Sequence, residues 1–173
     1  MKHIGLDMDG VIVDFMSPIC KKLGVDYDSI KDYNLEKQFP DKIDEIRKIY
    51  GKEGYFYNLK SYNGSTFLIN NLLNLGLKVW FISKPSSFSP ITYSDKIKWV
   101  KKHFPDLFKT TILTQDKERC YMDIFVDDDI RNIERNISDN KILFSQPWNK
   151  NYSGKYKVAK NYTDLLRIVK EII

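Results

Sequence analysis

The sequence predicts an α/β protein: a parallel sheet with helices on both faces and a small helical cap inserted after the first strand. Short apolar runs of strand length alternate with amphipathic helical segments along most of the chain. This alternation is typical of parallel sheets, in which each crossover carries a helix. The stretch 16–60 contains no convincing strand, which favours a helical insert. The predicted division is a core of residues 1–15 and 61–173 and a cap of residues 16–60.

The first predicted strand ends in a pair of acids. The apolar run Ile4-Gly5-Leu6 leads to Asp7 and Asp9, and a second apolar run begins at Val11. Both carboxylates therefore follow the carboxyl end of a strand, where open α/β sheets place their ligands. Two adjacent carboxylates repel each other and favour a cation or a shared proton between them. For this motif taken alone, an acidic turn is the alternative.

Two helices are expected in the cap. Ser17 is placed to cap the first, with Pro18 at its first position and Gly24 just past its end. The second follows Pro40 and stops at Gly51. Its apolar side chains fall on one side of the helix: Ile43, Ile46, Ile49 and Tyr50.

The rest of the chain alternates strands and helices in the order of a Rossmann-like sheet. The expected strands are apolar runs at 77–82, 111–113, 122–126 and 142–144, with a short one near Val158. The residues expected to begin the intervening helices are Ser65 or Thr66, Asp95, one of Asp127–Asp129, and Thr163. The apolar faces of these helices carry Leu68, Leu72 and Leu75; Ile97, Val100 and Phe104; Ile130, Ile133 and Ile137; and Leu165, Leu166, Val169 and Ile172.

The composition fits one globular chain with a sizeable core. Its 173 residues are 42% hydrophobic and 29% charged, which is ordinary. The formal net charge of +5 suits an anionic ligand, but the lysines are scattered along the chain. Scattered lysines favour a generally basic surface over a dedicated nucleic-acid face. We therefore expect no stable nucleic-acid partner.

Cysteine and histidine usage indicates a reducing setting. Cys20 and Cys120 lie far apart and outside any Cys-x-x-Cys motif, so free thiols in the cytoplasm are expected. His3 and His103 are the only histidines, which gives zinc little support. Lys2 leads into the acidic motif rather than a signal peptide, and no apolar run approaches the ~20 residues that span a bilayer. Monomer and homodimer are both open.

Polar residues follow four of the predicted strands. They are Asp7 and Asp9; Ser83 and Lys84; Lys117; and Asp127 and Asp128. Strand ends in such a sheet converge, so these side chains are expected to meet. Carboxylates suit a hard divalent cation, and a hydroxyl with lysines suits a phosphate. Singly, Ser83 could be a loop hydroxyl and Lys117 a surface lysine, and an N-cap accounts for one of the three consecutive aspartates.

These residues resemble the haloacid dehalogenase (HAD) superfamily of aspartyl phosphotransferases, and within it the 5'(3')-deoxyribonucleotidases. The first motif, Asp7 to Phe15, is close to the family form throughout. The segments 53–59, 112–117 and 126–128 are similar to the family's aromatic segment, its lysine segment and its last acidic motif. The resemblance runs over nearly the whole chain and is weak within about 20–50. One motif departs from it: Ser83-Lys84-Pro85 stands where relatives have Thr-Ser-Pro.

The resemblance implies a magnesium-dependent phosphoric monoester hydrolase, with a deoxyribonucleoside monophosphate as the small-molecule substrate. Asp7 would be the nucleophile that forms an aspartyl-phosphate, and Asp9 the general acid and then base. A haloacid dehalogenase has no comparable acid two residues after its nucleophile, so Asp9 favours a phosphatase. The Mg²⁺ ligands would be Asp7, the Asp9 backbone carbonyl and either Asp127 or Asp128.

The resemblance also implies how the substrate is held. Ser83 and Lys117 would hold the phosphate, and Lys84 would add a charge that strengthens its binding or alters nucleotide preference. Phe15, Tyr55 and Phe56 would form a wall for the nucleobase, with packing between cap and core as the alternative. Another small phosphate ester, a nucleic-acid 3'-phosphate end, or a non-catalytic nucleic-acid-binding module are the competing functions.

Overall fold

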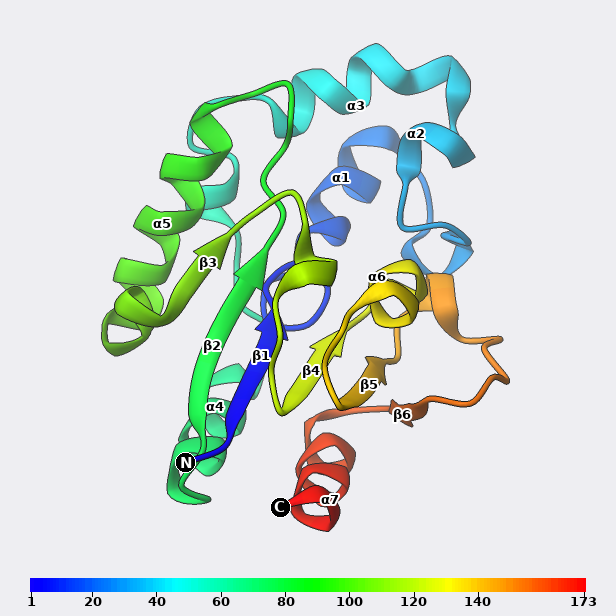
Figure 1. Ribbon diagram of the computed structural model, residues 1–173. Helices are drawn as coiled ribbons and strands as arrows, with labels where there is room; N and C mark the ends of the chain where they lie inside the picture. Colours follow the sequence, from blue (N-terminus) through cyan, green and yellow to red (C-terminus); the bar gives the residue numbers. More distant parts are fainter.

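The computed structural model describes all 173 residues, Met1–Ile173 (Figure 1). Six parallel strands form one sheet in the order β3-β2-β1-β4-β5-β6. The strands are β1 His3–Asp7, β2 Lys78–Ser83, β3 Thr111–Leu113, β4 Ile124–Asp127, β5 Asn140–Phe144 and β6 Lys157–Ala159. The predicted parallel α/β sheet is confirmed.

Helices cover both faces of this sheet. The helices of the chain are α1 Met16–Leu23, α2 Leu35–Gln38, α3 Ile43–Tyr50, α4 Ser65–Asn74, α5 Ile91–His103, α6 Ile130–Arg135 and α7 Tyr162–Ile172, of which α4–α7 pack on the faces of the sheet. On one face, α4, α5 and α7 bury their apolar sides against the strands in a cluster of 27 residues. On the other face, Ile133 of α6 packs against Ile82, Phe125 and Leu143 in a smaller cluster. Covered faces explain why the strands read as continuous apolar runs.

The strand order places three polar strand ends side by side. Strand β1 lies between β2 and β4, with Asp7 opposite Ile82 and Leu6 opposite Val126. Because the strands are parallel, Asp7, Ser83 and Asp127 reach the same edge of the sheet. That edge is the one over which α1–α3 lie in Figure 1.

Helices α1–α3 bury apolar side chains of their own. The eight buried residues of this cluster are Met16, Ile19, Cys20, Leu23, Ile30, Leu35, Ile46 and Ile49. All eight fall within 16–49. The boundaries of core and cap stay a prediction.

Several helix ends confirm the sequence signals and others do not. Gly24 ends α1 with a φ of 67°, and Gly51 ends α3, as predicted. The prediction that Ser17 caps α1 is wrong, because α1 begins at Met16 and Asp14 accepts the Ser17 backbone N–H at 3.1 Å. Asp129 caps α6, so the N-cap reading holds for one of the three aspartates.

Three further details differ from the predictions. Asp95 does not begin α5: the helix starts at Ile91, after Pro90, and Asp95 is buried within it. Ile137 is exposed, because α6 ends at Arg135 and its helical period no longer applies. Helix α2 was not predicted, since its four residues are too few to show periodicity.

Two smaller observations concern the thiols and membrane crossing. Cys20 and Cys120 are both free. None of the helices combines the length and the apolar character needed to cross a membrane.

Candidate active site

One lysine lies between two of the strand-end aspartates. Lys117 follows β3, and its Nζ lies 2.6 Å from Asp7 Oδ2 and 3.1 Å from Asp127 Oδ2. All three side chains are buried. Burial lowers the pKa of Lys117, but the charges of Asp127 and Asp7 outweigh it and hold that pKa above its ordinary value. Lys117 is therefore a permanent cation at the sheet edge.

A different lysine forms an ion pair with Asp9. Lys96 of α5 forms an ion pair with Asp9 Oδ2, and its Nζ donates to Ser83 Oγ at 3.1 Å. The same Nζ lies 4.3 Å from the centre of the Phe56 ring. Lys96 is 1% exposed, so this pair is withdrawn from solvent. The two acids of the first motif thus have separate cationic partners.

Sequence reasoning missed Lys96, although a signal for it exists. On α5 it stands four residues after Thr92 and three before Trp99, both of which are buried. This spacing puts a lysine on the buried face of a helix, where an unpaired ammonium is costly. A lysine in that position indicates a buried acidic partner.

We expect a double-mutant cycle on the buried pair to show strong coupling. Lys96→Met leaves the Asp9 carboxylate buried without its cation and should lower the free energy of unfolding by about 3–5 kcal/mol. Lys96→Met combined with Asp9→Asn removes both charges and should regain most of that loss. Denaturant unfolding of the four proteins measures the coupling. Additive single effects would contradict it.

Asp128 is the site's unsatisfied carboxylate. It is 0% exposed, and neither of its oxygens has a hydrogen-bond partner. Carboxylate oxygens of Asp7, Asp127 and Asp128 all lie within 4.8 Å of one another. Gly10, with a φ of 80°, allows this approach, because a Cβ there would collide with the Asp128 carboxylate.

The charges at this edge balance only if the acids hold protons or a further cation is bound. Burial raises the pKa of Asp7 from its ordinary 3.8 to about 8, although the charge of Lys117 lowers it. Burial, followed by the charges of Asp127 and Asp7, raises the pKa of Asp128 well above its ordinary value. One lysine faces three carboxylates. A hard divalent cation with oxygen ligands would offset the excess, so these residues fit the predicted Mg²⁺ site.

Asp127 differs from Asp128 in being fully hydrogen-bonded. It accepts from the Asp129 backbone N–H at 2.8 Å, from Asn132 Nδ2 at 3.1 Å and from Lys117. The neighbouring residues thus engage Asp127 and leave Asp128 open.

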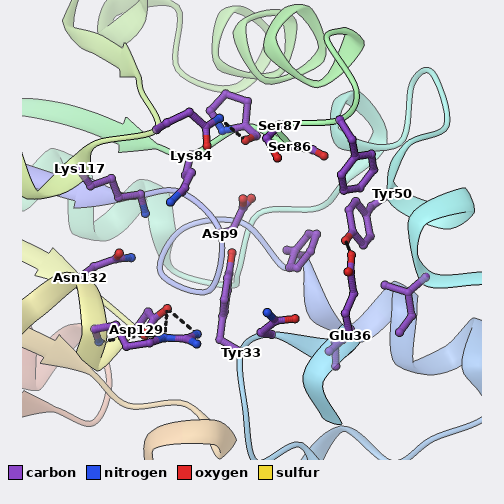
Figure 2. A pocket seen from close by; sticks show the side chains of 18 of the residues that line it. Asp9, Tyr33, Glu36, Tyr50, Lys84, Ser86, Ser87, Lys117, Asp129 and Asn132 are labelled. Carbon is purple, nitrogen blue, oxygen red and sulfur yellow. Dashed lines mark hydrogen bonds and ion pairs between the residues drawn. The ribbon is translucent and has the colours of Figure 1, made fainter. Parts of the chain in front are cut away.

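A cavity of about 510 Å³ lies over this edge, between the strand ends and α2–α3. Figure 2 shows side chains that line it. Asp9, Lys84 and Lys117 line its core side, and Tyr33, Glu36 and Tyr50 line the opposite side. Lys84 is exposed and makes no ion pair of 4.0 Å or less. The cationic Arg47 and Arg131 also line the cavity, but they are paired with Glu36 and Asp129.

Aromatic side chains form part of the cavity wall. Phe15 and Phe56 both line it, and their rings stack at 5.7 Å with an interplanar angle of 7°. Tyr55 does not line it. The Tyr55 hydroxyl donates to the Phe15 backbone carbonyl at 3.0 Å, and its ring packs edge-on against Phe15 and Phe56.

The structure therefore brings together all of the predicted catalytic, metal and phosphate residues, which are Asp7, Asp9, Ser83, Lys84, Lys117, Asp127 and Asp128. Their roles remain predictions. Of the three predicted substrate contacts, Phe15 and Phe56 face the cavity, and Tyr55 supports them from outside it.

A family model described as 5' nucleotidase, deoxy (pyrimidine), cytosolic type C protein matches residues 1–172. The chain belongs to this nucleotidase family. A relative from Acanthamoeba polyphaga mimivirus, whose name assigns it provisionally to the 5'(3')-deoxyribonucleotidases, is 30% identical over 138 residues. The match covers 73% of this chain and 62% of that relative, so the chain spans less than two thirds of the relative's length.

The resemblance to the nucleotidase family is confirmed, and the fold is that of HAD-superfamily hydrolases. The mitochondrial 5'(3')-deoxyribonucleotidase of Mus musculus is 27% identical to this chain, and the match covers 81% of this chain and 71% of the mouse protein. The solved structure of D,D-heptose 1,7-bisphosphate phosphatase from B. bronchiseptica, complexed with magnesium and phosphate, matches all of both chains. Its TM-score is 0.58 at 12% identity, which shows a shared fold. HAD-superfamily hydrolases are among the other structures that match.

Proposed function

We propose that this nucleotidase-family chain is a magnesium-dependent phosphatase that hydrolyses deoxyribonucleoside monophosphates through an aspartyl-phosphate on Asp7. One observation carries the proposal: the two acids of the first motif have different partners. Asp7 pairs with Lys117, and Asp9 pairs with Lys96. Acids in separate environments can take separate roles in one reaction.

Asp7 is suited to attack phosphorus. Its Oδ1 accepts the Met8 backbone N–H at 2.6 Å and its Oδ2 faces Lys117, which fixes the plane of the carboxylate. One Asp7 oxygen bonds to phosphorus as the bond to the ester oxygen breaks. Lys117 and the Ser83 hydroxyl offset charge on the transferring group, the main contribution of a protein to phosphoryl transfer.

Asp9 is suited to move the protons. Its Oδ2 is held by Lys96, whereas its Oδ1 has no hydrogen-bond partner, and the residue lines the cavity. In the first half-reaction it protonates the departing ester oxygen. In the second it takes a proton from water as the water oxygen bonds to phosphorus, and the Asp7–phosphorus bond breaks to release inorganic phosphate.

Asp7, Asp128 and the Asp9 backbone carbonyl would hold Mg²⁺. Asp128 is the better direct ligand than Asp127, because its oxygens lack other partners. When bound, the cation would supply positive charge against the phosphate oxygens. The heptose bisphosphate phosphatase, which shares the fold, is complexed with magnesium and phosphate, and this supports Mg²⁺ as the cation.

Family membership supports a nucleotide substrate, and the stacked Phe15 and Phe56 offer an apolar surface for a base. The cavity volume lies within the usual range for small-molecule sites, about 300–1,000 Å³. The family description supports a cytoplasmic location, although the mouse relative is mitochondrial.

The function is tested with a panel of deoxy- and ribonucleoside 5'- and 3'-monophosphates. Each is supplied with Mg²⁺ or with a chelator, and inorganic phosphate is measured. We expect release from deoxynucleotides that needs Mg²⁺. Sugar phosphates and a 3'-phosphorylated oligonucleotide complete the panel. If the protein hydrolyses the sugar phosphates or the oligonucleotide but no mononucleotide, the proposed substrate is refuted. The proposed hydrolysis of a phosphate monoester is then still supported.

A further inference from the structure

Tyr33 is a cavity residue that neither the sequence motifs nor the proposed reaction uses. It precedes α2 and lines the cavity, and Figure 2 shows its hydroxyl directed toward Asp9 from the opposite side. The hydroxyls of its neighbours Tyr27, Tyr50 and Tyr55 all have protein partners. The Tyr33 hydroxyl has none, and it is not closed off from the cavity. It is thus a free donor directed at the reacting centre.

The direction of this hydroxyl is fixed by packing and by an ion pair. The Tyr33 ring lies 6.1 Å from the ring of Phe15 and 6.0 Å from that of Trp148. The preceding residue, Asp32, lies 3.4 Å from Arg131 of α6, and the following residue, Asn34, caps α2. A side chain held from both sides can act as a preorganised donor, without reordering during reaction.

Burial and the surrounding negative charge keep this donor protonated. Burial raises the pKa of Tyr33 well above its ordinary value, and the charges of Asp9, Asp7 and Asp128 add to the increase. A neutral tyrosine beside carboxylates can donate a hydrogen bond to an anionic oxygen and adds no negative charge of its own.

We propose that the Tyr33 hydroxyl donates a hydrogen bond to the phosphate ester of the substrate beside Asp9. The segment before α2 then contacts the reacting group itself, and not only the remainder of the substrate. The inference rests on the proposed function in one respect, that the substrate is a phosphate monoester.

Tyr33→Phe removes the hydroxyl and keeps the ring. The variant is assayed on a deoxynucleotide and on para-nitrophenyl phosphate, which has neither base nor sugar. We expect kcat to fall roughly 10- to 100-fold on both substrates with little change in KM, because the lost contact acts mainly in the transition state. Tyr27→Phe is the matched control. It loses a hydroxyl that bonds Gln146 outside the cavity and should stay within about threefold of wild-type kcat.

Two outcomes overturn the proposal: an unchanged kcat on both substrates, or a loss confined to the nucleotide, which would place the hydroxyl against base or sugar. Turnover of para-nitrophenyl phosphate but of no nucleotide by the wild type refutes the proposed substrate and still decides the Tyr33 question. If the wild type turns over neither, its affinity for orthovanadate with Mg²⁺ replaces kcat. A Tyr33→Phe affinity at least tenfold weaker then supports the contact, and a smaller change overturns it.

Discussion

Asp7→Asn is expected to lower kcat by about 10⁴-fold or more and to leave the fold intact. An amide is nearly the same shape as a carboxylate and can still accept the Met8 backbone N–H, but it is not a nucleophile toward phosphorus. The charged Asp7 carboxylate also destabilises the metal-free fold, because burial raises its pKa to about 8. The variant should therefore unfold at no lower temperature than the wild type. Phosphate release and thermal unfolding measure the two effects.

The covalent step gives a second readout of Asp7. Acid quenching of the wild type during turnover of a ³²P-labelled nucleotide should trap label on the protein, and Asp7→Asn should trap none. Asp41→Asn, at an exposed position before α3, is the matched control and should behave as wild type. Phosphate release by Asp7→Asn above about 1% of the wild-type rate would contradict the assignment of the nucleophile.

The sequence predicted the sheet well, because a parallel sheet covered on both faces leaves a strong local signal. Runs such as 79–82 are apolar throughout, and glycines such as Gly24 and Gly51 mark helix ends. The helix predictions that were wrong also have local causes. Pro90 begins α5 earlier than Asp95 would, and α2 is a single turn fixed by its Asn34 cap and by the buried Leu35.

The site was predictable where its residues follow strands. Asp7, Ser83 and Asp127 lie at strand ends, so the topology alone brings them together. Lys96 and Tyr33 could not be placed in this way. Lys96 reaches Asp9 from the side of a helix, and Tyr33 reaches the cavity from a segment with no regular pattern. Contacts of this kind depend on how α5 and the segment before α2 pack over the sheet edge, which no short motif encodes.

Chelation of Mg²⁺ is expected to destabilise the protein more at pH 8 than at pH 5. The folded-state pKa of Asp7, about 8, lies above its ordinary 3.8, and that of Asp128 is shifted the same way. The protonated acids therefore favour the metal-free fold below about pH 4, and this stability is lost as pH rises toward 8. A divalent cation replaces those protons. At 100 times its Kd it adds about 2.7 kcal/mol, or roughly 5–10 °C in Tm.

The Asp128→Asn variant distinguishes the effect of Mg²⁺ binding on Tm from the other effects of pH on Tm. The amide removes the one carboxylate with no hydrogen-bond partner, so the chelated variant should have a higher Tm than the chelated wild type at pH 8. It should also lose most of the Mg²⁺-dependent rise in Tm. Asp106→Asn, at an exposed position, should keep the wild-type rise. A site built from these buried acids must exchange protons for metal, so its effect on Tm depends on pH. A Mg²⁺-dependent rise in Tm that is equal at pH 5 and pH 8 would therefore mean that the cation binds elsewhere. A rise that survives Asp128→Asn would mean the same.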